Sequence, residues 1–368
     1  MASAPSHALK TALAAMRCDV ILADNAINPS KIGFFNQNQL LEVWHQQDEG
    51  LMGRIVWARI IHIFPQHHRA ALRLPDGLEA SMRLPSSARL IAGQMVVVTI
   101  TAEAYADKPA AAILGAEMAG ALTILKLGGR GEIRSSHKSR TADDNANTQI
   151  LEALEACQKQ LPDGTDIIVR RRGQTVEIDD VIAEISDATD RANAAWQEVQ
   201  VKASEPKLID KGLPATTKAV MHAPDAKQVF DASHSHWDLL AEQAEAACGE
   251  AVFTHSGICL WFHQTRAVMA VDVDSASSNL SPEALAGEAC IAFMQQVRLR
   301  QLGGNIIFDL PRMGRAGRAE ALAYLNALAE LDPRHPDILG FGPAGMIEMR
   351  IRHGRTPHHD VKAVAEIL

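Results

Sequence analysis

The segment that decides the fold of this 368-residue chain is residues 264–309, which read QTRAVMAVDVDSASSNLSPEALAGEACIAFMQQVRLRQLGGNIIFD. Residues 267–273 are an apolar run that predicts a strand, with Asp272 and Asp274 at its end. Because side chains alternate along a strand, these two carboxylates point to the same face. Residues 305–308 predict a second strand, which runs into Asp309.

A helix is expected between these two strands. Ser281 is a suitable N-cap, Pro282 suits the first turn, and Gly303-Gly304 is expected to end the helix. A strand, a helix and a strand of these lengths predict a right-handed crossover between parallel neighbouring strands. Both strands then deliver carboxylates to one edge of the sheet, where open α/β sheets place their ligands.

The three aspartates predict a metal-dependent catalytic centre. Carboxylates that converge at one edge repel one another unless a cation lies between them, and their hard oxygen atoms suit Mg²⁺. One such aspartate usually only caps a strand end. The metal hypothesis therefore depends on Asp272, Asp274 and Asp309 acting together.

Two runs in this region, QTRAVMAVDVDS (264–275) and EACIAFMQQVRLRQLGGNIIFD (288–309), closely resemble the catalytic core of the ribonuclease E/G family. In that family an apolar strand ends in Asp-x-Asn, and Arg-Leu-Arg-x-Leu-Gly-Gly precedes a strand that ends in Asp. The later run GMIEMR (345–350) resembles the family's Gly-Leu-x-Glu-Met segment. The long, ungapped second match makes the resemblance specific.

The fold class expected is α/β, with an α+β multi-domain organisation. From the residues alone, the short β runs between Gly50 and Leu114 predict a small closed barrel such as an OB fold. The prolines and lysines of residues 204–231 predict a linker with little regular structure. The resemblance implies an RNase H-like and DNase I-like catalytic core, with an inserted OB-fold β-barrel and a small 5′-sensor domain. The expected division is 1–49, N-terminal RNase H-like part; 50–117, OB-fold RNA-binding domain; 118–185, 5′-phosphate sensor-like domain; 186–247, second RNase H-like part with linker; and 248–368, DNase I-like catalytic domain.

The resemblance also implies roles for single residues of the catalytic segment. Asp272 and Asp309 match the principal metal ligands, and Asp274 matches the residue that orients the metal or its water. The family usually has asparagine at the position of Asp274, so this residue is a departure. Arg298 and Arg300, at the end of the helix, are interpreted either as phosphate contacts or as compensation of the helix dipole.

Further RNA contacts are expected outside the catalytic segment. The run PDGTDIIVR (162–170) resembles the family's 5′-phosphate sensor, so Arg170 is the candidate for bidentate contact with a 5′-monophosphate. Arg171 replaces the family's threonine, and Arg130, Arg134 and Lys138 are expected on the other wall of that pocket. A solvated strand end is the alternative for these arginines. Trp57 is interpreted as a base-stacking residue or a barrel-core residue, and Lys108 partly matches an RNA-contacting lysine.

Composition bounds these interpretations. The net charge of −8 argues against a protein that binds nucleic acid over its whole surface, but the basic residues are clustered, which suits a local groove. No apolar run reaches membrane-span length, and the N-terminus lacks a signal-peptide core. The five cysteines are scattered, so a disulfide framework is disfavoured and a cytoplasmic location fits. Because the family's zinc-binding Cys-x-x-Cys is absent, a homo-oligomer is left open, but not one joined by zinc.

The sequence therefore predicts a Mg²⁺-dependent endoribonuclease that cuts single-stranded RNA and favours 5′-monophosphorylated ends. The main alternative is an RNA-binding offshoot of the family with weak or lost catalysis, because the motif departs from the family after Asp309 and within the barrel. A metal-dependent phosphoesterase acting on other substrates is the third hypothesis. The OB-like segment and the sensor-like strand argue against that third hypothesis.

Overall fold

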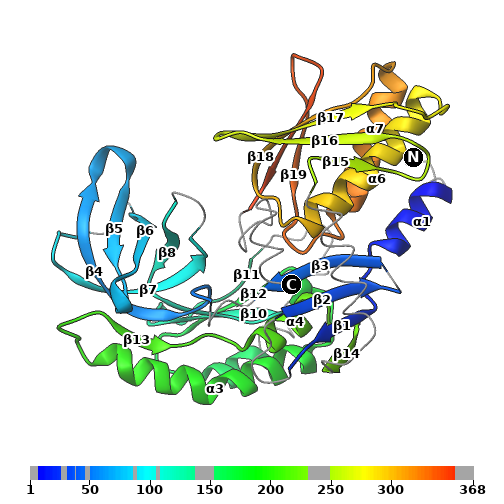
Figure 1. Ribbon diagram of the computed structural model, residues 1–368. Coiled ribbons are helices and arrows are strands. Elements are labelled where there is room, and N and C mark those ends of the chain that lie inside the picture. The colour runs from blue at the N-terminus through cyan, green and yellow to red at the C-terminus, as the bar shows by residue number, and fades with distance from the viewer. Residues whose placement is uncertain are drawn as a thin grey trace. The chain divides into compact units, whose positions relative to one another are not determined.

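The computed structural model describes residues 7–25, 31–37, 39–45, 50–85, 89–104, 108–136, 153–230 and 249–352. These residues form a mixed α/β protein with several sheets and a closed five-stranded β-barrel (Figure 1). The chain divides into two compact units, Met1–Gln47 with Pro214–Leu368, and Asp48–Leu213. The predicted α/β class is confirmed, whereas the RNase H-like and OB-fold assignments and the five-part division stay predictions.

The six-stranded sheet of the first unit carries the segment quoted above. Its strand order is β15-β16-β17-β18-β20-β19, and α6 and α7 belong to the same region. The elements are β15 (Ala251–Phe253), β16 (Cys259–Gln264), β17 (Val268–Asp274), α6 (Pro282–Leu299), β18 (Gly304–Asp309), α7 (Arg315–Ala329), β19 (Asp337–Phe341) and β20 (Ile347–Ile351). Only β17 and β18 are parallel neighbours; every other adjacent pair described in this sheet is antiparallel.

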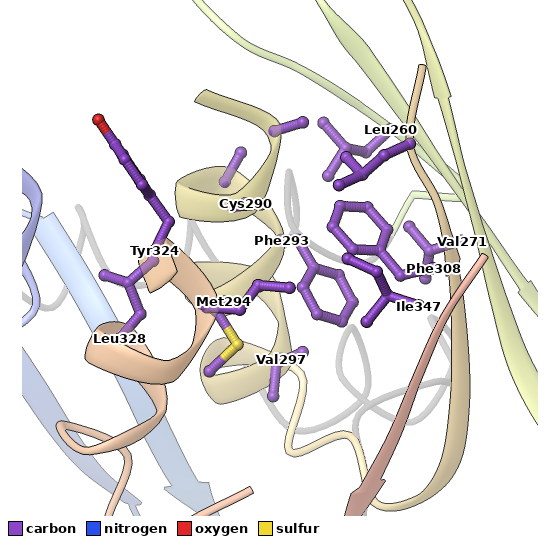
Figure 2. Close-up of a cluster of buried hydrophobic side chains, with 14 of the residues drawn as sticks. Leu260, Val271, Cys290, Phe293, Met294, Val297, Phe308, Tyr324, Leu328 and Ile347 are labelled. Carbon is purple, nitrogen blue, oxygen red and sulfur yellow. The ribbon is translucent and has the colours of Figure 1, made fainter. Parts of the chain in front are cut away.

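One face of this sheet packs on α6 and α7. Figure 2 shows Val271, Phe308 and Ile347 of the sheet gathered around Phe293 of α6. The rings of Phe293 and Phe308 stack with centroids 4.2 Å apart and planes inclined by 14°. Since alternate residues of a strand point to opposite faces, the residues between these buried ones project from the other face of the sheet.

The other sheet of this unit joins distant parts of the chain. Its order is β14-β1-β2-β3, with β14 parallel to β1 and the other neighbours antiparallel. The elements around it are α1 (His7–Ala15), β1 (Val20–Ala23), β2 (Lys31–Asn36), β3 (Gln39–His45), α4 (Ala215–His222) and β14 (Lys227–Phe230). The linker expected over residues 204–231 is therefore wrong, because α4 and β14 lie within it. A four-residue strand has little local signal, and β14 is stabilised by its pairing with β1.

The barrel lies in the second unit. Its strands follow the order β4-β5-β6-β8-β7, and β7 closes the barrel by pairing with β4. They are β4 (Ile55–Phe64), β5 (Arg69–Arg73), β6 (Glu79–Arg83), β7 (Met95–Ala102) and β8 (Ala110–Leu114), and β13 (Lys207–Asp210) adds to β4 from outside. The predicted closed barrel over residues 50–114 is confirmed. β13 is a second element inside the segment that was expected to be a linker.

A four-stranded sheet and a long helix complete the second unit. The sheet order is β11-β12-β10-β9, built from β9 (Ala116–Ala119), β10 (Thr123–Leu127), β11 (Ile133–Ser135) and β12 (Asp166–Val169), and α3 (Ile178–Gln200) shares its core. Buried side chains of α3 extend from Val181 to Ala195. The boundary expected between residues 185 and 186 thus falls inside one helix that packs as a single element.

No helix in the described part of the chain is both long enough and apolar enough to cross a membrane.

Candidate metal centre at the ends of β17 and β18

The edge at which β17 and β18 end is positioned by the helix between them. The two strands are parallel, with Val268 opposite Asn305 and Asp272 opposite Asp309, as the strand–helix–strand pattern predicts. The Ser281 hydroxyl accepts a hydrogen bond from the Ala284 amide at 3.3 Å, which makes Ser281 the N-cap of α6 as expected. The carboxyl ends of both strands therefore lie at the same end of the sheet.

Asp272 and Asp309 are register partners on these adjacent strands. Adjacent strands lie about 5 Å apart, so the two carboxylates start from neighbouring positions. Each follows a buried core residue, Val271 or Phe308, and alternation turns both carboxylates away from α6 and α7. Both aspartates are exposed, and within the described ranges neither carboxylate has a hydrogen-bond or ion-pair partner.

Asp274 lies two residues farther along β17, on the same face. Its Oδ1 accepts a hydrogen bond from the Ala276 amide at 2.9 Å, and Ala276 has a left-handed φ of 42°. One oxygen of Asp274 is thus engaged in the turn that follows the strand. A pocket of about 510 Å³ opens beside the two β17 carboxylates; it is lined by Asp272, Val273, Asp274, Ser275, Ser278, Leu280, Pro282, Leu285 and Pro311.

The donor set fits Mg²⁺ better than a metal that needs a closed protein cage. In the described residues no group of three or more His, Cys, Asp and Glu side chains is gathered to hold a metal. The structure therefore offers the pair Asp272 and Asp309, with Asp274 alongside, and not three converging ligands. Mg²⁺ commonly keeps several waters and binds through one or two carboxylates plus substrate phosphates. Two exposed carboxylates at a sheet edge suit that coordination.

The helices that follow the two strands also begin at this edge. α6 starts after β17 and α7 starts after β18, so the positive ends of both helix dipoles lie on the carboxylate side of the sheet. Arg312, Arg315 and Arg318 are exposed in the loop after Asp309 and in the first turn of α7. From the sequence these three appear only as one basic cluster among several. In the structure they lie next to the candidate site, because β18 ends at Asp309 and α7 begins six residues later, at Arg315.

Arg298 and Arg300 have other partners. Arg298 is 3% exposed; its Nε donates to Glu42 Oε2 at 3.0 Å and its Nη1 to the Met16 carbonyl at 2.8 Å. Arg300 donates to Gln296 Oε1 and to the Gly249 carbonyl, and its guanidinium lies 4.2 Å from the centroid of the Phe262 ring. Both arginines are therefore engaged in structural contacts, and of the two interpretations left open by the sequence, these contacts favour a structural role over phosphate contact.

Glu42 of β3 is the centre of the network that holds Arg298. It is 2% exposed and accepts hydrogen bonds from Trp44 Nε1 at 2.6 Å, Gln301 Nε2 at 2.7 Å and Arg298 Nε, while His222 Nε2 lies 2.7 Å away. Burial alone would raise the pKa of Glu42, but His222 and then Arg298 hold it well below its usual range. This network joins β3 to the end of α6, and so fixes the start of β18.

The end of α6 contains a strained residue that the network supports. Gln301 has a left-handed φ of 53°, which costs about 1–2 kcal/mol for a residue with a Cβ. Its side-chain amide also donates to the Arg298 carbonyl at 2.9 Å, in addition to Glu42. The helix therefore ends through Gln301, two residues before the glycine pair that the sequence pointed to. Gly304 then begins β18 with a φ of 91°.

The candidate phosphate sensor lies on the β10–β12 pair. Thr123 of β10 pairs with Val169 of β12, and Lys126 pairs with Asp166. Arg170 follows Val169, whereas the Arg130 amide donates to Asp166 Oδ1 at 2.7 Å. The two arginines therefore start from opposite ends of a four-residue ladder, about 13 Å long. The expected shared pocket with Arg130 as its other wall does not follow from this topology.

Arg170 is tied to the turn before β10. Its Nη1 donates to the Gly120 carbonyl at 2.6 Å. Glu184 of α3 fixes the same turn, because it accepts hydrogen bonds from the amides of Ala121, Leu122 and Thr123. Arg170 and Arg171 are exposed at the side-chain level. Of the other residues expected on that wall, Arg134 of β11 lies opposite Ile168 in the register, is exposed and begins nearer to Arg170 than Arg130 does, whereas Lys138 lies outside the described residues.

The two residues expected to contact RNA from the barrel differ in exposure. Trp57 of β4 is half-buried, and its indole N–H donates to the Glu198 carbonyl of α3 at 3.4 Å. Lys108 is exposed just before β8. Trp57 thus contacts α3 and is not part of the barrel core, and Lys108 lies on the surface.

Comparison with known proteins identifies one family. Residues 235–353 match the model of the Ribonuclease E/G family, a range that includes the whole β15–β20 sheet with Asp272, Asp274 and Asp309. No curated protein matches the chain.

Proposed function

We propose that this chain is a Mg²⁺-dependent endoribonuclease that cuts single-stranded RNA, because its residues 235–353 match the model of the Ribonuclease E/G family. Ribonuclease activity on RNA is what the family match supports. The metal dependence and the internal cleavage are the finer parts of the proposal. The observation that supports both parts is the register pairing of Asp272 with Asp309, both exposed, near the ends of β17 and β18 inside the matched segment.

In the proposed mechanism Asp272 and Asp309 would hold the metal, and Asp274 would orient water beside it. When bound, Mg²⁺ supplies the charge that neutralises the scissile phosphate and activates water for in-line attack. A new P–O bond forms to the water oxygen while the P–O3′ bond breaks. The 3′ oxygen takes up a proton, so the products carry a 5′-phosphate and a 3′-hydroxyl.

The arginines at the start of α7 are proposed to hold the RNA backbone. Arg315 and Arg318 are exposed in the first helical turn after Asp309, where the helix dipole adds to their positive charge. Arginine side chains bind phosphate in a bidentate manner. Phosphates on either side of the scissile bond would then be attracted to an edge whose own carboxylates repel them.

The proposed preference for 5′-monophosphorylated ends depends on Arg170, with Arg171 next to it. The hydrogen bond from Arg170 Nη1 to Gly120 orients the guanidinium and leaves its other N–H groups to bind a phosphate. A terminal monophosphate carries more negative charge than an internal phosphodiester, so it is the better ligand for this arginine.

The decisive experiment uses a fluorescent, 5′-monophosphorylated single-stranded RNA, incubated with Mg²⁺ or with EDTA. Internal cuts that require Mg²⁺ are expected for the wild-type protein. Asp309→Asn should lower the cleavage rate by about a hundredfold or more. The metal stabilises the charge of the transition state by several kcal/mol, and asparagine would hold the metal more weakly than aspartate does.

Asp337→Asn is the matched control. Asp337 is also an exposed strand aspartate of the same sheet, but it pairs with Arg350 in the row of Asn305, at the opposite end from Asp309. Its replacement should leave cleavage unchanged. Equal cleavage by wild type and Asp309→Asn would contradict the proposal and would indicate a contaminating nuclease.

The second candidate function is RNA binding with weak or no catalysis. It is favoured by the absence of a cluster of three ligands in the described residues and by the use of one Asp274 oxygen in a turn. RNA binding without cleavage, equal in the wild type and Asp309→Asn, would support it.

A further inference from the structure

A tryptophan lies in the same row as the proposed metal ligands. Trp261 of β16 pairs with Asp272 of β17, which pairs with Asp309 of β18. Register partners on adjacent strands project from the same face of a sheet, about 5 Å apart. The row Trp261–Asp272–Asp309 therefore places an indole ring one strand away from the first ligand and two strands away from the second.

This indole is on the open face of the sheet. Its neighbours along β16, Leu260 and Phe262, are buried among the residues that pack on α6 and α7, whereas Trp261 is 36% exposed. Phe253 of β15 projects from the same face one row farther on, beside Cys259 and Asp274, and is 68% exposed. The carboxylates are thus flanked on one side by exposed aromatic surface.

Three structural roles that would account for a tryptophan at this position do not fit Trp261. It is not a core residue, because the core lies on the other face of β16. It does not protect a sheet edge, because β16 lies between β15 and β17. Within the described ranges its indole N–H has no hydrogen-bond partner and its ring has no aromatic partner. An exposed tryptophan beside Asp272 is best explained as a contact for a ligand that has a flat, apolar surface.

We propose that Trp261 is the stacking platform for a nucleobase of the single-stranded RNA substrate, next to the scissile phosphate. The inference rests on the proposed function, since it takes the Asp272–Asp309 edge as the site of cleavage. Stacking is suited to this place because the carboxylates around it repel the RNA backbone, whereas an indole attracts any base by its π-face without depending on charge. Trp261 is then a positioning residue that sets which phosphate reaches the metal ligands.

The proposal has a specific signature in binding. Stacking of one base on an aromatic side chain changes the affinity by about five- to a hundredfold when the side chain is removed. Contacts to phosphate make binding depend on salt, and stacking does not. Trp261→Ala should therefore weaken RNA binding to a similar extent at every salt concentration, whereas Arg315→Ala should lower the salt dependence itself.

The test has two parts, run on the full chain. Binding of a fluorescent single-stranded RNA is measured by anisotropy in EDTA, across a salt series, for wild type, Trp261→Phe, Trp261→Ala, Arg315→Ala and Leu339→Ala. Leu339 is the matched control, because it is an exposed apolar residue (58%) on β19 of the same sheet. Cleavage is then measured with Mg²⁺ on RNA that carries one abasic nucleotide on either side of the mapped cleavage site.

We expect Trp261→Ala to lower affinity and kcat/KM about tenfold, Trp261→Phe to retain most of both, and Leu339→Ala to match the wild type. The abasic substitution at the stacked position should reduce cleavage by the wild type and have little further effect in Trp261→Ala. If Trp261→Ala binds like the wild type, or if it loses the same factor on intact and abasic RNA, the stacking proposal is overturned. If the wild-type protein does not cut RNA at all, the proposed function fails, but the anisotropy series in EDTA still decides whether Trp261 contacts the bases.

Discussion

Replacing Glu42 by glutamine should destabilise the unit that contains the β15–β20 sheet. The carboxylate is 2% exposed and compensates the charge of Arg298, which is 3% exposed and has only the Met16 carbonyl as its other described acceptor. Glu42→Gln keeps the size of the side chain but removes its charge. Leaving one member of a buried ion pair without its partner costs about 3–5 kcal/mol. We expect the free energy of unfolding to fall by that amount.

The assay is urea denaturation followed by far-UV circular dichroism and tryptophan fluorescence, which includes a signal from Trp44 beside Glu42. Glu198→Gln is the control, because Glu198 forms an ion pair with Lys207 in which both side chains are about half exposed. Removal of such a pair costs at most about 1 kcal/mol. A loss below about 1 kcal/mol for Glu42→Gln as well would refute the assignment of Glu42 as an essential buried charge.

The pH dependence gives an independent check on Glu42. Its pKa is lowered in the folded state, so the unfolded state binds the proton more readily. The stability that the Glu42 charge contributes is therefore fully present above the unfolded pKa, near the ordinary value of 4.5, and is lost as the pH falls through the lower folded pKa. The difference between wild type and Glu42→Gln should accordingly shrink only under acid conditions. A difference that stays constant into that range would contradict the assignment.

Four further predictions concern single residues. Arg170→Gln should abolish any preference for RNA with a 5′-monophosphate over RNA with a 5′-hydroxyl, measured as the ratio of the two cleavage rates; an unchanged ratio would remove Arg170 from the proposed sensor. Glu184→Gln should lower the free energy of unfolding by about 2 kcal/mol, because its carboxylate accepts backbone N–H groups of the turn before β10, and urea denaturation would show it. Phe308→Ala should cost about 3–5 kcal/mol in the same assay, since the ring is fully buried against Phe293; a smaller loss would mean that the core collapses around the gap. Burial raises the pKa of the Cys290 thiol, so this cysteine should react with a thiol reagent only after the protein is unfolded; rapid labelling of the folded protein would contradict its buried position.

The strand–helix–strand segment was predictable because its signals are local. The apolar run before Asp272, the Ser281 cap and the run before Asp309 each specify an element within a few residues, and the structure has these elements in parallel register. The barrel was predictable for the same reason, since turn residues separate its short strands. The resemblance to the family lies in the same segment that the family model matches.

The errors all concern residues whose surroundings come from distant parts of the chain. The sequence left Arg298 as either a phosphate contact or a compensation of the helix dipole, because its buried partner Glu42 is 256 residues away. β13 and β14 looked like a linker, because a four-residue strand gains its stability from pairing with β4 and β1. Arg130 and Arg170 looked like neighbours until the β10–β12 ladder placed them at opposite ends.

The sequence by itself thus determined the elements of the candidate site and the chemistry of its carboxylates, because hydrophobic periodicity and caps act over one or two turns. Only the tertiary structure decided which side chains share the site. Register across strands is set by long-range pairing, and it brings Trp261 into the row of Asp272 and Asp309. Hydrogen bonds to Glu42 and to the Gly249 carbonyl, both distant in the sequence, hold Arg298 and Arg300 in the interior.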